Sequence, residues 1–258
     1  MEFTDIESMN ESFSTLSTFE NESTNGTNWL STSTEDIGKG FVSAFLMTAV
    51  SEIGDKTFFI AVVLSLSHLA KFVFAGAISA LILMTALSVG LGMAFSKIPS
   101  VWVHGLSTLL FLIFGGKMLR EGCKMNSSSG KEELEEVQRT VDIKMSSKVK
   151  EKDVEAGIRK SSTRWVFVEA FIMTFLAEWG DRSQIATVVL AAKESVIGVL
   201  FGAIVAHAAC TLAAVIGGKV ISDRISLRAV TIFGGLLFFA FAINSFVEVF
   251  ADISLASS

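Results

Sequence analysis

Six long apolar blocks limit most strongly what this chain can fold into. They cover roughly residues 41–66, 72–95, 101–119, 165–192, 195–221 and 229–250. About 20 apolar residues in a helix cross a hydrocarbon core of about 30 Å, and the blocks have about that length. Of the 258 residues 51% are hydrophobic and 18% are charged, which is more apolar surface than a soluble domain of this size could bury. The sequence therefore predicts an all-α polytopic membrane protein with six transmembrane helices.

The polar segments divide the chain into five parts. The linker between the third and fourth blocks holds 10 of the 21 lysines and arginines, and the N-terminal tail is acidic and rich in Ser, Thr and Asn. Within the linker, a short solvated helix is expected around Glu132 to Arg139. The predicted division is a disordered acidic tail (1–39), a first three-helix repeat (40–120), a charged linker (121–164), a second three-helix repeat (165–250) and a short tail (251–258).

The charge distribution predicts the orientation. Basic residues gather in the linker and in the short loops on its side, which places the linker in the cytosol by the positive-inside rule. The N-terminal tail carries three N-glycosylation patterns, at Asn10, Asn21 and Asn25. Both features indicate an N-terminus on the lumenal or extracellular side.

The two halves of the chain repeat one another. Shifting the sequence by 126 residues places Glu52, Gly54 and Asp55 on Glu178, Gly180 and Asp181, and the match continues from Gly76-Ala77-Ile78 onto Gly202-Ala203-Ile204. Each repeat has three predicted spans. Since this number is odd and the linker stays on one side, the second repeat must enter the membrane in the opposite sense, as in many secondary transporters.

The chemistry is carried by two motifs in the middle of the first and fourth blocks. They read Glu52-Ile-Gly-Asp-Lys-Thr57 and Glu178-Trp-Gly-Asp-Arg-Ser183. Ionisable groups at mid-bilayer cost at least about 2.5 kcal/mol each and are functional by default. On a helix, a Glu and an Asp three residues apart lie on one face. Gly54 and Gly180 would admit a neighbouring helix or weaken their own.

Bringing the two motifs together would gather four carboxylates at mid-membrane. Oxygen ligands suit hard divalent cations such as Ca²⁺, Mg²⁺ or Mn²⁺. The four acids and two bases sum to about −2, so one divalent cation exchanging for about two protons is the natural hypothesis. No permanently bound cofactor is expected. The proposed ligands are Glu52, Asp55, Glu178 and Asp181, supported by the bases Lys56 and Arg182, the hydroxyls of Thr57 and Ser183, and the amide of Gln184.

Three other interpretations compete with this one. The acids could pair with Lys56 and Arg182 purely as structural contacts between helices. A divalent-cation channel would also use charged mid-span residues. An intramembrane aspartyl protease would use Gly-Asp pairs. Such proteases resemble the pattern G-x-G-D, whose first residue is Gly, whereas both motifs of this chain begin with Glu. His207 in the fifth block either relays protons or is a polar residue satisfied by a neighbouring helix.

The paired E-x-G-D-[KR]-[TS] motifs, in two three-helix halves joined by a charged loop, resemble the transmembrane protein 165 family across residues 40–250. The resemblance implies a Mn²⁺ and/or Ca²⁺: proton exchanger rather than an enzyme, with the four motif carboxylates as cation ligands. It also implies that the first motif is reached from the cytosol and the second from the lumen. We therefore expect divalent ions, protons and the lipid bilayer as partners, with no nucleic acid. A homodimer is left open. The expected location is the Golgi membrane, with the plasma membrane or another endomembrane as the alternative.

Overall fold

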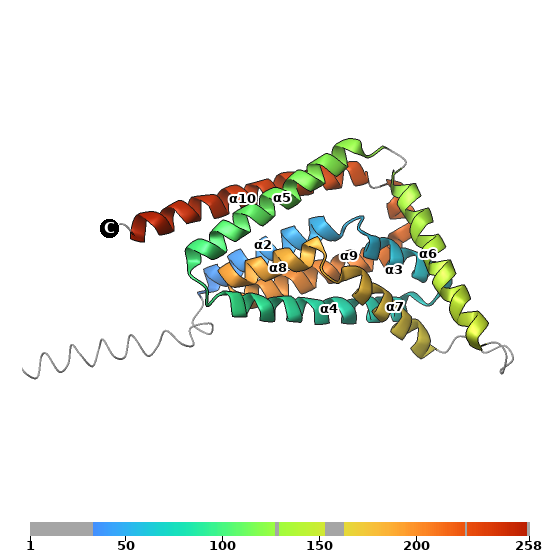
Figure 1. Cartoon of the computed structure of the whole chain (residues 1–258). Coiled ribbons are helices and arrows are strands. Elements are labelled where there is room, and N and C mark those ends of the chain that lie inside the picture. The colour runs from blue at the N-terminus through green and yellow to red at the C-terminus, as the bar shows by residue number, and fades with distance from the viewer. Residues whose placement is uncertain (1–32, 127–128, 153–162, 225, 257–258) are drawn as a thin grey trace, which may run out of the picture.

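The computed structural model describes residues 33–126, 129–152, 163–224 and 226–256, and the regular structure in these ranges is helical (Figure 1). The helices are α2 (Thr34–Glu52), α3 (Lys56–Ser67), α4 (Ala70–Phe95), α5 (Ser100–Lys124), α6 (Ser129–Lys152), α7 (Thr163–Glu178), α8 (Arg182–Lys193), α9 (Val196–Arg224) and α10 (Leu227–Ala256). The prediction of an all-α protein is confirmed.

Four of these helices are long and apolar enough to cross a membrane. They are α4, α5, residues Val196–Gly217 of α9 and residues Leu227–Ser254 of α10. The two motif-bearing blocks instead form two helices each, α2 with α3 and α7 with α8. The chain is therefore polytopic, and its two motif-bearing segments are interrupted helices.

A glycine turn causes each interruption. Gly54 has φ +83° and Gly180 has φ +78°, a region of backbone space that glycine enters without a Cβ clash. In both turns the aspartate N–H donates to the carbonyl of the preceding glutamate, at 3.1 Å. The expectation that Glu52 and Asp55 share one helix face is wrong, because Glu52 ends α2 and Asp55 is the N-cap of α3.

The two halves pack against each other in a reciprocal way. In Figure 1, α2 and α3 run from left to right, whereas α7 and α8 run from right to left. Helix α2 lies along α9, and α7 lies along α4. A Cβ built on Gly202 would overlap the Phe41 carbonyl, and one built on Gly76 would overlap the Phe167 carbonyl. Since the 126-residue shift relates both members of these pairs, the internal repeat of the sequence is also a repeat of contacts.

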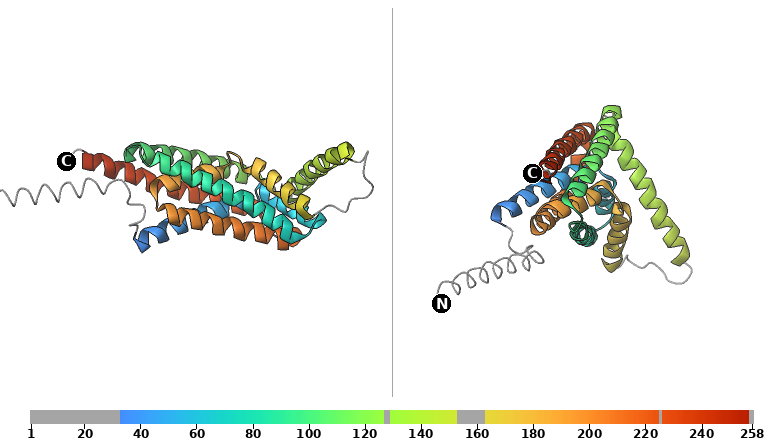
Figure 2. Two further views of the ribbon diagram at one scale, coloured as in Figure 1. Left: turned by 90° about the horizontal axis from the view of Figure 1, so that it is seen from below. Right: turned by 60° about the vertical axis from the view of Figure 1, so that its left-hand side comes forward.

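Helices α5 and α10 form an extended pair along one side of this core (Figure 2). Their shared face is aromatic: the rings of Phe111 and Phe238 meet edge to face with centroids 6.0 Å apart. Both side chains are almost fully buried, so this pair is held by apolar packing.

The helices extend further into the polar segments than the sequence suggested. Helix α2 begins at Thr34, inside the predicted tail, where Ser33 and Asp36 form a capping box. Helix α6 is 24 residues long, where only a short helix was expected, because Val137 and Val141 are buried in a cluster with residues of α3. Helix α10 continues to Ala256, into the predicted C-terminal tail. The glycosylation patterns at Asn10, Asn21 and Asn25 lie outside the described residues.

Candidate metal site

Three motif carboxylates meet where the interrupted helices cross. One oxygen each from Glu52, Glu178 and Asp181 lies within 4.8 Å of the other two. Glu52 ends α2, Glu178 ends α7, and Asp181 is the N-cap of α8. The glutamates are 3% and 2% exposed. Oxygen ligands lie about 2.0 to 2.6 Å from Mg²⁺ or Ca²⁺, so this spacing allows all three carboxylates to reach one ion.

Hydroxyl and amide groups fix the orientation of these carboxylates. Thr57 donates from Oγ1 to Glu52 Oε2 at 3.3 Å, and Ser183 donates from Oγ to Asp181 Oδ1 at 3.0 Å. The same Asp181 oxygen accepts from the Gln184 backbone N–H at 2.8 Å, which caps α8. Asp181 is thus held in place by its own helix, and its remaining oxygen stays available to an ion.

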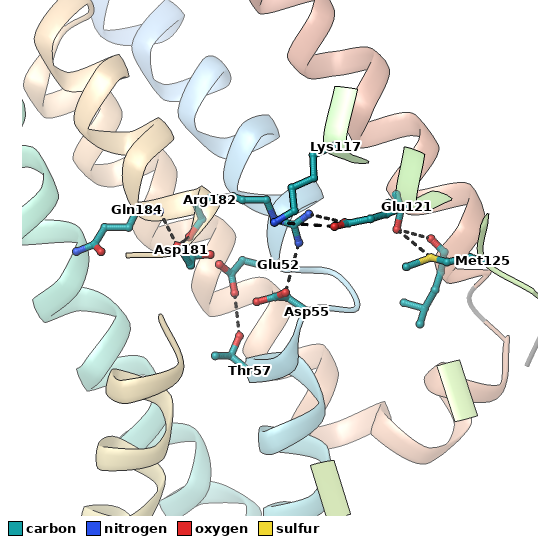
Figure 3. Close-up of polar contacts among 12 residues, drawn as sticks. Glu52, Asp55, Thr57, Lys117, Glu121, Met125, Asp181, Arg182 and Gln184 are labelled. Atoms are coloured by element: carbon teal, nitrogen blue, oxygen red, sulfur yellow. Dashed lines mark hydrogen bonds and ion pairs between the residues drawn. The ribbon is translucent and has the colours of Figure 1, made fainter. Parts of the chain in front are cut away.

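Asp55 is oriented differently from its counterpart. It occupies the N-cap position of α3 but makes no side-chain capping bond there. Instead, Asp55 Oδ1 lies 3.4 Å from Arg182 Nη2, across the boundary between the two motifs (Figure 3). Arg182 Nη1 is also 3.4 Å from Glu121 Oε2 on α5. The fourth proposed ligand therefore lies beside the three-carboxylate group, paired with a guanidinium.

Several buried polar atoms at the crossing make no hydrogen bond within the described part of the chain. They are Glu52 Oε1, Glu178 Oε1, Ser51 Oγ and His207 Nδ1. Buried carboxylate oxygens without a donor are costly, and they are the kind of atoms that a hard cation binds.

Two small cavities flank the carboxylates, each of about 10 Å³. One is lined by Glu52 and Thr57, and the other by Glu178, Ser183 and His207. A volume of about 10 to 15 Å³ of this kind holds one water molecule. Each of these two cavities is therefore too small for a fully hydrated ion.

Three features of this region were not predicted from the sequence: the partner of Glu121, the partner of His207 and the place of Lys56. Glu121 was assigned to the start of the linker, yet it lies on α5 and pairs with Arg182. His207 Nδ1 lies 3.6 Å from Glu52 Oε1. Lys56 does not face the carboxylates as Arg182 does; it lines a separate cavity of about 180 Å³ between α3, α6 and α7, together with Glu133. An acid near the end of an apolar block was the only signal in the sequence for Glu121.

Comparison with known proteins leads to the same class. The family model described as divalent cation/proton antiporter GDT1 matches residues 40–126 and 166–253, which include both motifs. A GDT1-like protein of Synechocystis sp. is 41% identical over 206 residues, covering 80% of this chain and 95% of that protein. GDT1-like protein 5 of Arabidopsis thaliana is 42% identical over 218 residues, again covering 80% and 95%. No solved structure matches.

These matches confirm the resemblance drawn from the motifs. The family is one of transporters, so the interpretation as a protease is set aside. Because its members are antiporters, the interpretation as a divalent-cation channel is also set aside. The spanning helices of the described ranges agree with an integral membrane protein. The chain belongs to the GDT1 family of divalent cation/proton antiporters.

Proposed function

We propose that this antiporter exchanges Mn²⁺ or Ca²⁺ for protons at one site near the middle of the bilayer, formed by Glu52, Asp55, Glu178 and Asp181. The observation that carries the proposal is the approach of three of these carboxylates, from both motifs, to within 4.8 Å. An all-oxygen site with hydroxyls nearby favours Ca²⁺ or Mn²⁺ over zinc or copper, which prefer nitrogen and sulfur ligands.

The proposed architecture is six membrane-spanning segments in two inverted repeats, 40–120 and 165–250, joined by a cytosolic linker at 121–164. The reciprocal packing of α2 on α9 and of α7 on α4 supports it. Inverted repeats allow the two halves to exchange conformations around one site. The site would then open to the cytosol through the first motif and to the lumen through the second.

Charge balance supports the coupling of metal to protons. Three carboxylates close together in an apolar interior require compensation, and either a divalent cation or bound protons would supply it. The tight cavities beside Glu52 and Glu178 favour an occluded, dehydrated ion over a stream of hydrated ions. We propose that one divalent cation exchanges for about two protons on this basis.

We place the protein in the Golgi membrane, with the tail 1–39 in the lumen and residues 251–258 on the same side. Glycosylation at Asn10, Asn21 or Asn25 would fix this orientation. Treating the protein with a glycosidase should shift its mobility on a gel, and a variant with all three asparagines changed to Gln should show no shift. Glycosylation of the linker instead would contradict a lumenal N-terminal tail.

The site is tested with purified protein in liposomes that contain a pH-sensitive dye. Glu52→Gln, Glu178→Gln and Asp181→Asn should each lower the rate of Mn²⁺-driven proton movement at least about tenfold, because each removes a charged ligand at a desolvated site. Glu35→Gln is the matched control, since Glu35 is an exposed acid paired with Lys39 at 2.9 Å.

Two results would contradict the proposal. If Glu52→Gln carried Mn²⁺ at the normal rate, the carboxylate site would be wrong. If Mn²⁺ and Ca²⁺ both failed to move protons in the wild-type protein while another divalent cation did so, the choice of ion would be wrong.

A further inference from the structure

Arg182 is shared between the two halves of the protein. It is the first residue of α8, next to the proposed ligand Asp181, yet its guanidinium contacts Asp55 of the other motif and Glu121 of α5 (Figure 3). Both contacts measure 3.4 Å, longer than the 2.7 to 2.9 Å of a committed ionic hydrogen bond. The guanidinium is therefore divided between two carboxylates rather than locked onto one.

The side chain of Asp55 is held less firmly than that of Asp181. Asp181 accepts the capping bond of α8, whereas Asp55 makes no side-chain capping bond to α3. Its side chain is 23% exposed, as is that of Arg182. If the pair with Arg182 were released, Asp55 could turn towards the three-carboxylate group without breaking a helix cap.

Glu121 would remain as a partner for Arg182 once Asp55 has turned towards the three carboxylates. A partly buried arginine without a counter-ion would be costly, and Glu121 already lies at the required distance. Lys117, one turn earlier on α5, lies 3.9 Å from the other oxygen of Glu121. The 126-residue shift maps Glu121 onto Val247 and Arg182 onto Lys56, so the first motif has no equivalent arrangement.

We propose that Arg182 is an internal cation that competes with the transported metal for Asp55, and that Glu121 is the positioning residue that receives Arg182 when Asp55 turns to the metal. This inference rests on the proposed carboxylate site. It assigns to Glu121 a role in the apparent affinity for metal, separate from ligation itself.

The test is the KM for Mn²⁺ of the full-length protein in liposomes. Glu121→Gln should raise KM about fivefold, as expected for the loss of one partly exposed ion pair, with the maximal rate changed by less than about twofold. Glu121→Asp keeps the charge and should restore most of the affinity. Glu135→Gln is the matched control, because Glu135 pairs with Arg139 on the exposed face of α6.

A double-mutant comparison separates this role from a structural one. Mn²⁺ binding to the purified variants is measured by calorimetry. Arg182→Gln should tighten binding, because it removes the competing cation, and adding Glu121→Gln should then change nothing further. The proposal is overturned if Glu121→Gln leaves KM unchanged, or if it weakens binding equally with and without Arg182.

The role of Glu121 and the carboxylate site can be disproved separately. Either of those outcomes would leave the carboxylate site intact, provided that Glu52→Gln still lowers the transport rate at least about tenfold. A wild-type protein that bound neither Mn²⁺ nor Ca²⁺ would overturn the proposed function, and this inference with it.

Discussion

The imidazole Nδ1 of His207 lies 3.6 Å from Oε1 of Glu52, and both side chains are almost fully buried. His207 comes from α9 of the second half and Glu52 from α2 of the first. The residue related to His207 by the repeat is Leu81, so the first half supplies no imidazole at the equivalent place, and His207 also lines the cavity beside Glu178. The two halves thus give their glutamates different surroundings.

Replacing His207 by Leu should impair transport without unfolding the protein. The change leaves Glu52 with one polar neighbour fewer, which should lower the rate of Mn²⁺-driven proton movement about tenfold. The apolar substitute suits a helix that packs between others, so the melting temperature in detergent should stay close to that of the wild type. Normal transport by His207→Leu would show that the imidazole only fills space.

The two motif glycines should differ in their tolerance of a side chain. Gly54→Ala and Gly180→Ala both place a Cβ on a residue with positive φ, which costs about 1 to 2 kcal/mol. At Gly54 the Cβ also overlaps Leu227, whereas no atom outside the immediate chain lies within 4 Å of one at Gly180. Gly54→Ala should therefore lower the melting temperature more than Gly180→Ala.

Asn serves as the control for backbone conformation. Because Asn adopts positive φ more readily than Ala does, Gly180→Asn should destabilise the protein less than Gly180→Ala. Equal losses for Gly54→Ala and Gly180→Ala would mean that the contact with Leu227 adjusts easily.

The helix crossings at Gly76 and Gly202 should be equally sensitive. An added methyl group would overlap the Phe167 carbonyl in one case and the Phe41 carbonyl in the other. Each Ala variant should lose about 1 to 3 kcal/mol, measured by thermal unfolding in detergent. Gly90→Ala is the control in α4, because its Cβ has open space and Ala favours helix. Unequal losses at the two crossings would argue against reciprocal packing.

Glu194 should make stability depend on pH. It lies between α8 and α9, and burial raises the pKa of its carboxyl above the usual 4.5, although Lys193 opposes this. The folded state therefore binds the proton more tightly than the unfolded chain. This contribution to stability is present at low pH and is lost as the pH rises from 4.5 through the raised value.

Glu194→Gln removes this ionisation. Its melting temperature should exceed that of the wild type at about pH 7.5. The difference should shrink towards about pH 4, where the Glu194 carboxyl is mostly protonated in the folded and the unfolded chain alike. An equal gain at both pH values would show that the amide stabilises the protein through packing instead.

The helix interruptions could be predicted only in part from the sequence. The glycines were recognised as positions that could weaken a helix, yet an unbroken helix was used to place Glu52 and Asp55 on one face. Local sequence does not fix φ at a glycine, which enters positive and negative values with similar ease. Each glycine turn separates two half-helices, and Asp55 at the start of α3 pairs with Arg182 instead of sharing a helix face with Glu52.

The sequence by itself determined the membrane class, the internal repeat, the motifs and the family, because block length, self-similarity and residue identity can be read directly along the chain. Only the tertiary structure decided which carboxylates meet, that Arg182 is shared with Glu121, and that His207 approaches Glu52. These contacts join residues from separate helices, and their geometry depends on how the helices cross. No periodic pattern in the chain records such a distance.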